Sequence, residues 1–297
     1  MRQSLRRRAV RAMFHALGAA SGCALLLAAL PTHAGVLPSA ACDAGDVVVL
    51  ASDTGSLPEA RAIWLDRRTL RWPGAPGDGR YRLHAGDTLP DARPGQRVRG
   101  ATRTIELTPA TQPADEVMQR FRHVGPGPTL AIGLDDADLR ALHRQALLLV
   151  REDARGHVLE ATRIQLPGAL DDLYAAAAEA PMPGAYPAPG GTRFSVWAPT
   201  ARQVSLCLYP DDQGVAVQRV AAEPDPATGM WTVRLPQDLR GAYYAWLVDV
   251  HVPGTGLVRN RVTDPYSLSL GTDSRRSYVA DLDDPALKPA GWDDAPR

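Results

Sequence analysis

The sequence predicts an all-β protein with two immunoglobulin-like β-sandwich domains in tandem, which follow a signal peptide and are joined by a short helical, Pro/Gly-rich linker. Among its 297 residues, 26 glycines and 26 prolines divide the chain into short segments, which favours turns and strands over long helices. Apolar and polar residues alternate in many of these segments, as in half-buried strands. The hydrophobic share of 45% is enough to form a core, and the helical segments are too few for a (β/α)₈ barrel.

The first 34 residues have the three parts of a secretory signal peptide. A basic start between Arg2 and Arg11 precedes an uncharged, apolar run from Ala16 to Leu30, and small residues end at Ala34. The apolar run is too short to cross a membrane comfortably, and no later run is long enough to span one. We therefore predict cleavage after Ala34 and a periplasmic or secreted location, with no transmembrane span.

Removal of Cys23 with the signal peptide leaves Cys42 and Cys207. A disulfide is permitted outside the cytoplasm, but Cys207 lies in an alternating segment and has the features of a small core residue. We therefore expect free thiols and keep a Cys42–Cys207 disulfide as the alternative. A lipid anchor on Cys42 is a further alternative, although Ser39 stands where a lipoprotein signal usually has leucine.

The first sandwich is predicted over residues 42–166. Turn-forming residues separate its short β-branched or alternating segments, and acidic residues open one short helix, at about 136–144, where the helix dipole favours them. The expected strands are residues 46–50, 60–65, 69–72, 80–83, 104–107, 129–132, 147–151 and 158–164.

Residues 167–191 are predicted to be the linker, because a short helix-favouring stretch around Leu170–Ala178 gives way to prolines and glycines. The second sandwich is predicted over residues 192–285. Roughly seven strands within about 90 residues are typical of an immunoglobulin-like fold. The clearest strands are residues 193–199, 204–210, 230–235 and 243–250.

Composition excludes several function classes. Lys+Arg 33 balances Asp+Glu 33, so nothing favours nucleic acid or an anionic membrane surface as a partner. Three cysteines cannot form a four-thiolate zinc site. The histidines lack paired zinc spacing, and neither a nucleophile elbow nor a phosphate loop is present. We therefore predict no metal, no cofactor and no nucleic-acid partner.

Three segments of the second sandwich, Phe194–Ala201, Val204–Tyr209 and Gly241–Trp246, resemble the opening, second and late strands of carbohydrate-binding module family 48. The Asp-Pro-Tyr signature that closes this module is matched within Val262–Ser267. Upstream, Ala60–Pro73 and Ala169–Tyr174 resemble the amino-terminal domain of bacterial pullulanases.

This resemblance implies an extracytoplasmic enzyme that cleaves α-1,6 branches in pullulan, starch or glycogen. Such cleavage needs two carboxyl groups across the scissile bond, and in this family both lie in a glycoside hydrolase family 13 barrel. None of the barrel motifs occurs here, and the acid pairs of this chain lie in turns and helix starts. We therefore expect the non-catalytic front of a pullulanase, without catalytic residues and inactive alone.

Residues 286–297 are expected to begin the connection to the barrel, which would be supplied in cis or in trans. The residues expected to dock the barrel are Asp264, Pro265, Tyr266 and Trp292, with an exposed apolar patch near residues 260–292. Two alternatives remain open: a free-standing α-glucan-binding protein, and a sandwich module that binds another protein.

Aromatic residues are the candidates for α-glucan binding, because a flat indole packs on the C–H face of a sugar. Trp64, Trp72, Tyr209 and Trp231 are the expected sugar contacts, with core packing as the alternative. Trp197 and Trp246 are expected in the core. In glycogen-binding members of the family a Lys and a Trp contact sugar. Here Ala245 and Arg261 stand at those positions.

Overall fold

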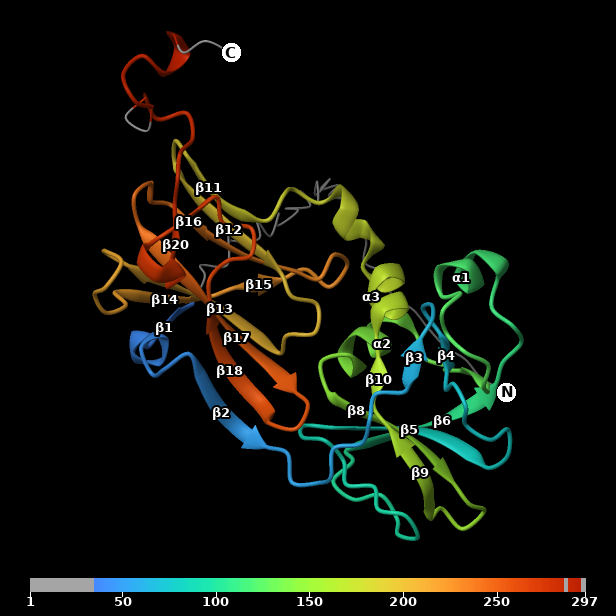
Figure 1. Cartoon of the computed structure of the whole chain (residues 1–297). Helices are drawn as coiled ribbons and strands as arrows, with labels where there is room; N and C mark the ends of the chain where they lie inside the picture. The colour runs from blue at the N-terminus through green and yellow to red at the C-terminus, as the bar shows by residue number, and fades with distance from the viewer. Residues whose placement is uncertain (1–34, 286–287, 295–297) are drawn as a thin grey trace, which may run out of the picture. The chain divides into compact units, whose positions relative to one another are not determined.

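The computed structural model describes residues 35–285 and 288–294, so the predicted signal peptide lies outside the described residues (Figure 1). None of the helices within the described residues has the length and apolar character needed to cross a bilayer. Strands dominate both halves of the chain, which confirms the all-β fold class.

One eight-stranded sheet forms the first half, in the order β10-β3-β4-β7-β6-β5-β8-β9. The strands are β3 (Ala62–Trp64), β4 (Thr69–Arg71), β5 (Arg80–Gly86), β6 (Arg103–Pro109), β7 (Thr129–Ala131), β8 (Ala146–Glu152), β9 (Val158–Thr162) and β10 (Ile164–Gln165). The strand predictions in this half are matched, and the predicted 158–164 strand is divided into β9 and β10.

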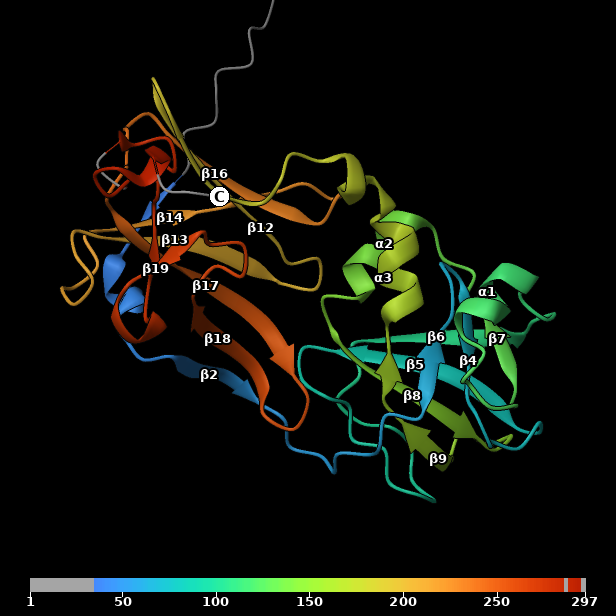
Figure 2. The same cartoon turned by 45° about the horizontal axis from the view of Figure 1, so that its top comes forward.

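Three helices accompany this sheet: α1 (Asp115–Arg120), α2 (Asp136–Leu142) and α3 (Pro167–Leu173). The side chain of Asp135 accepts a hydrogen bond from the Asp138 backbone N–H, which caps the start of α2 as the acidic residues predict. Leu139 of α2 and Leu173 of α3 are buried in the same core as Leu83 and Leu149 of the sheet. Helices α2 and α3 therefore close one end of the first hydrophobic core (Figure 2).

The second half contains two sheets. One has eight strands, with the path β1-β14-β13-β17-β18-β2 and the pair β19 and β20 attached to β17. Its strands are β1 (Val36–Leu37), β2 (Val47–Ser52), β13 (Gln203–Tyr209), β14 (Gln218–Ala221), β17 (Tyr243–Val252), β18 (Gly256–Val262), β19 (Ser269–Leu270) and β20 (Ser277–Tyr278).

The other sheet has four strands in the order β11-β12-β16-β15. Its strands are β11 (Gly184–Ala188), β12 (Gly191–Trp197), β15 (Glu223–Pro224) and β16 (Met230–Leu235). The two sheets enclose a core in which Phe194, Leu206, Val233 and Trp246 are fully buried. The expectation that Trp246 belongs to a core is confirmed.

The predicted boundary at residue 42 is wrong, because residues 36–52 pair with the second sandwich. Strand β1 pairs with β14 at one edge of the eight-stranded sheet, and β2 pairs with β18 at the other. The β-branched residues within 46–50 indicate a strand but say nothing about its partner, which lies some two hundred residues along the chain. The first domain is therefore inserted between the strands of the second.

The predicted linker is also too long. Residues 184–188 form β11, which pairs with β12 at the edge of the four-stranded sheet. Pro187 argues against a strand when the sequence is considered alone. An edge strand nevertheless tolerates proline, because one side of it needs no ladder hydrogen bonds. Only the helical stretch of α3 and the short 3₁₀ helix η2 (Ala175–Glu179) separates the two sandwiches.

The expectation of free thiols is wrong, because Cys42 and Cys207 form a disulfide across a sequence separation of 165 residues. Both residues are fully buried. No local pattern reveals a pairing this distant, since it depends on the return of the amino-terminal segment to the second sandwich. A sulfur held in this bond cannot also carry a lipid, so the disulfide and the lipid anchor at Cys42 exclude each other.

Two polar residues tie the sandwiches together. The carboxylate of Asp53 accepts hydrogen bonds from the backbone N–H groups of Leu89 and Gly254, and it lies 3.0 Å from His251 Nε2. Arg202 donates to the backbone carbonyl of Arg144 at 2.9 Å and to the carboxylate of Asp87 at 2.9 Å. Both residues join segments far apart in the sequence.

We expect Arg202→Ala to lower the free energy of unfolding by about 1–3 kcal/mol, because it removes charge-assisted hydrogen bonds between the sandwiches. Differential scanning calorimetry should show a lower melting temperature or two separated transitions. The matched control is Arg97→Ala, which replaces an exposed arginine of the first sandwich. Equal melting curves for both variants and the wild type would contradict a role for Arg202 in joining the sandwiches.

Candidate functional site

A segment that we call the strap, residues 36–52, crosses the outer face of the eight-stranded sheet of the second domain (Figure 1). Its two ends are β1 and β2 at opposite edges, and the 3₁₀ helix η1 (Ser39–Cys42) lies between them. Cys42 packs there in a separate apolar cluster with Cys207, Tyr209, Ala245 and Leu247. The strap therefore covers apolar residues that would otherwise face solvent.

All four aromatic residues expected to contact sugar are buried. The exposed fraction is 0% for Trp64 and Trp72, 1% for Tyr209 and 4% for Trp231. Trp231 Nε1 donates to the Ala198 carbonyl at 2.9 Å, and the Tyr209 hydroxyl donates to the Cys42 carbonyl at 3.1 Å. The expectation that these rings face solvent is wrong, because a buried ring offers no free face to a sugar.

The physical reasons differ between these residues. Trp64 and Trp72 belong to the core of the first domain, and Trp231 belongs to the core between the two sheets of the second. Tyr209 points to the outer face of its sheet, as a sugar contact should, but the strap lies over it. Trp197, expected in a core, is only partly buried and packs against the core of the first domain.

The strap also covers Ala245 and Arg261, the two positions that the resemblance to glycogen-binding modules aligns with sugar contacts. Ala245 is 1% exposed and packs in the cluster beneath Cys42. Arg261 donates to the Cys42 carbonyl at 2.9 Å and to the Asp46 carboxylate at 2.6 Å. This face therefore lacks the lysine and the tryptophan of those relatives and is closed by the chain itself.

The outer face of the four-stranded sheet carries a groove with a volume of about 250 Å³. Polar side chains from β12 and β16 form its floor, where Arg193 lies opposite Arg234 and Ser195 lies opposite Thr232. Tyr186, which is 39% exposed, pairs with Arg193 at the side of β11. The remaining residues of the groove are Ala180, Pro181, Glu223, Pro224, Asp225, Thr228 and Met230.

Arg193 is held in a fixed position within this groove. Its guanidinium donates to the Ser195 hydroxyl at 2.7 Å and to the Met182 carbonyl at 3.0 Å, and lies 4.6 Å from the centre of the Tyr186 ring. Burial lowers the pKa of Arg193, and the positive charge of Arg234 lowers it further. Arg234 itself is exposed and directly opposite, so two positive charges face the same groove.

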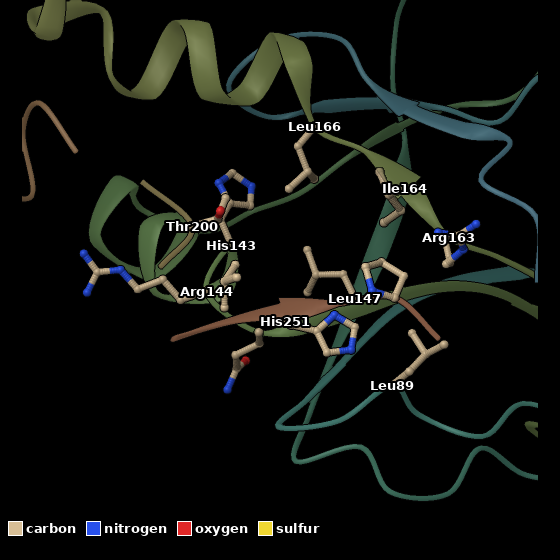
Figure 3. Close-up of a pocket in the computed structure, with 12 residues that line it drawn as sticks. Leu89, His143, Arg144, Leu147, Arg163, Ile164, Leu166, Thr200 and His251 are labelled. Carbon is tan, nitrogen blue, oxygen red and sulfur yellow. The ribbon is translucent and has the colours of Figure 1, made fainter. Parts of the chain in front are cut away.

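A second cavity, of about 160 Å³, is lined by His143, Arg144, Leu147, Ile164 and His251 among others (Figure 3). Neither ring nitrogen of His143 has a hydrogen-bond partner within the described residues. The ring packs edge-on against Trp64 at 4.7 Å, and burial lowers the pKa of His143 to about 4. This imidazole is therefore neutral in the folded protein.

Of the residues expected to dock the barrel, Asp264 is internal. Its exposed fraction is 3%, and its carboxylate accepts hydrogen bonds from the Tyr244 hydroxyl at 2.9 Å and the Tyr266 backbone N–H at 2.8 Å. Burial raises the pKa of Asp264. The Asp-Pro-Tyr signature is thus a turn that is hydrogen-bonded to the core, and the side chain of Asp264 is too buried to contact another domain.

The other residues of that set remain accessible. Pro265 is exposed, Tyr266 is half-buried and Trp292 is 63% exposed. Large apolar side chains between residues 260 and 292 are exposed as expected, although the structure does not describe residues 286 and 287. They are Val262, Leu268, Leu270, Leu282 and Trp292.

Two domain families match this chain. Residues 59–172 match the pullulanase N2 domain, and residues 182–267 match carbohydrate-binding module 48, the isoamylase N-terminal domain. The chain therefore contains a pullulanase N2 domain followed by a carbohydrate-binding module 48. Neither match includes the strap, which explains why the second domain seems continuous in sequence although its sheet is completed by residues 36–52.

Full-length pullulanases are among the similar sequences. Klebsiella pneumoniae pullulanase is 38% identical over 238 residues, which are 79% of this chain and 21% of that protein. The chloroplastic pullulanase 1 of Arabidopsis thaliana is 30% identical over 237 residues, or 79% of this chain and 24% of the relative. The chain thus spans less than a quarter of the length of these relatives.

Solved structures agree with the sequence matches. Apo pullulanase from Klebsiella pneumoniae superposes with a TM-score of 0.72 at 36% identity, over 80% of this chain and 25% of that chain. The same enzyme complexed with maltotriose gives a TM-score of 0.72 at 35% identity, over 81% of this chain and 22% of that chain. The fold of the two domains is therefore similar to part of these pullulanase structures.

Among the described residues, no cluster of three or more His, Cys, Asp or Glu side chains could hold a metal ion. The buried residues His84 and Glu152 form a network with the partly buried Arg82, in which His84 Nε2 lies 2.9 Å from Glu152 and Arg82 donates to Glu152 at 2.9 Å. Burial lowers the pKa of His84. This network stabilises the first sheet and does not border either cavity.

Proposed function

We propose that this chain serves as the non-catalytic amino-terminal region of a pullulanase-type debranching enzyme, where it positions the catalytic barrel and binds α-glucan. The observation that carries this proposal is the pair of matched domains in pullulanase order, with 36–38% identity to the Klebsiella pneumoniae enzyme over about four-fifths of the chain. The catalytic chemistry of the family would come from a family 13 barrel, supplied in cis or in trans.

Two structural features support this role. The exposed apolar side chains between residues 262 and 292 form the end of the described chain that is closest in sequence to the expected barrel, and exposed apolar groups favour contact with another domain. The buried disulfide supports a location outside the cytoplasm after removal of a signal peptide, because such bonds persist in oxidising compartments.

The test uses the purified chain from residue 35 onward. We expect affinity gel electrophoresis to show retardation by pullulan and amylopectin, and we expect no retention on insoluble cellulose. A reducing-sugar assay on branched glucan should show no release by this chain alone. Release of reducing ends would overturn the non-catalytic role, and absence of glucan binding would overturn the glucan-binding role.

Two other readings are separated by the same measurements and by the gene. A free-standing α-glucan-binding protein would bind glucan but have no barrel reading frame downstream of codon 297. A module that binds another protein would not bind glucan, and no reading frame for a barrel would follow codon 297. A barrel frame directly downstream, together with tight association between the barrel and this chain, would support the proposed positioning role.

A further inference from the structure

We propose that the α-glucan site of this chain is the groove on the outer face of the four-stranded sheet, floored by β12 and β16, and not the strap-covered face used by glycogen-binding relatives. This inference rests on the proposed function and names the place where glucan would bind. The two faces differ in accessibility. The strap buries Ala245 and engages Arg261 with Cys42 and Asp46, whereas the groove opens to solvent.

The groove has an elongated geometry. Across three strands, Tyr186, Arg193 and Arg234 stand in one row. Neighbouring strands lie about 4.8 Å apart, so this row extends roughly 10 Å across the sheet. In the next row Thr232 is partly exposed, whereas Ser195 is buried and its hydroxyl group accepts a hydrogen bond from Arg193. The surface is thus a shallow trough along a row of long side chains, a shape suited to an extended chain of sugar rings.

The groove carries charges of both signs. It contains two arginines, Arg193 and Arg234, and two acidic residues, Glu223 and Asp225. The formal charges cancel, so the net charge of the groove favours neither an anion nor a cation. The Asp225 carboxylate is engaged within its own turn, where it accepts hydrogen bonds from the Ala227 backbone N–H and the Thr228 hydroxyl. Charged groups form strong hydrogen bonds to neutral partners, so the oxygen atoms of a neutral polyhydroxyl ligand can accept from the exposed guanidinium of Arg234.

The groove combines a fixed arginine with an exposed one. Arg193 is oriented by Ser195 and by the Met182 carbonyl, so it is preorganised at the floor. The side chain of Arg234 is exposed and lies opposite Arg193 at the rim of the groove. Tyr186 adds an exposed aromatic ring, and rings of this kind pack on the apolar face of a sugar.

The test measures dissociation constants for pullulan by affinity electrophoresis and for maltohexaose by titration calorimetry. We expect Arg234→Ala and Tyr186→Ala each to weaken binding about tenfold, the effect of losing one charged hydrogen bond or one stacking contact. Arg97→Ala is the matched control for an exposed arginine and should bind like the wild type. Both altered groove positions are exposed, so melting temperatures should change little.

A cysteine-free variant tests whether glucan binds at the strap-covered face instead. Replacing Cys42 and Cys207 with serine loosens the strap, and we expect this double variant to bind pullulan with the wild-type dissociation constant. Wild-type affinity in both groove variants would overturn the groove assignment while leaving the proposed glucan binding intact. A gain of binding in the cysteine variant that does not depend on Arg234 would overturn it in favour of the strap-covered face. Failure of the wild type to bind any glucan would overturn the proposed glucan role and this site with it.

Discussion

Reduction of the Cys42–Cys207 disulfide should lower the free energy of unfolding by about 2–5 kcal/mol. The bond joins residues 165 positions apart, and the chain-entropy account gives the largest stabilisation for long closed loops, about 5 kcal/mol at this length. The effect is expected to be large because the same bond holds η1 over an apolar cluster. Urea unfolding of the oxidised and reduced protein at one pH measures the difference.

The cysteine-free double variant Cys42→Ser/Cys207→Ser is the control. It should unfold at the midpoint of the reduced wild type, and added reductant should not change its midpoint further. Limited proteolysis should then cut within residues 36–52 in the reduced protein and not in the oxidised one. Coinciding midpoints for oxidised and reduced wild type would show that the strap does not depend on the disulfide.

A large loss of stability is also expected on mild acidification. His143 is neutral in the folded protein because burial lowers its pKa from 6.5 to about 4. Below pH 6.5 His143 binds a proton in the unfolded chain but not in the folded chain. The free energy of unfolding therefore falls as the pH drops from 6.5 towards 4. At about 1.4 kcal/mol per pH unit, the loss reaches about 3 kcal/mol.

We expect His143→Leu to remove this part of the pH dependence, because leucine fills the site without a titrating group. Urea unfolding at pH 7 and at pH 4.5 measures the slope for each protein. His84 remains in both proteins, and burial lowers its pKa too, so part of the slope should persist. His123→Leu replaces an exposed histidine and serves as the control. An unchanged slope in His143→Leu would contradict a buried, neutral imidazole.

Local patterns predicted the elements of this fold well. Alternation marked strands such as β6 and β16, and the acidic residues before Leu139 marked α2, because these signals depend on neighbouring residues. Pairing could not be predicted in the same way. Nothing in residues 46–50 indicates β18 as their partner, and nothing near Cys42 indicates Cys207, since both contacts are made across an inserted domain.

The site was harder to predict than the fold. Tyr209 lies on the outer face of its strand, as its alternation indicates, but burial by the strap is a property of a distant segment. The groove left a weak signal in the sequence. In β12 and β16 the polar residues Arg193 and Arg234 alternate with Phe194 and Val233, yet only the register of the sheet reveals that these arginines face each other.

The inserted domain sets an order of events during synthesis. Residues 36–52 leave the ribosome early, but their partners β14 and β18 follow only after the whole N2 domain has been made. The first strands must therefore wait unpaired while the inserted domain folds, and oxidation of Cys42 must wait for Cys207. A shortened protein that begins at residue 59 would leave β14 and β18 with open edges and Cys207 with a free thiol. Unprotected edges recruit other chains, so such a protein should aggregate and form intermolecular disulfides, even though both matched domains would be present in full.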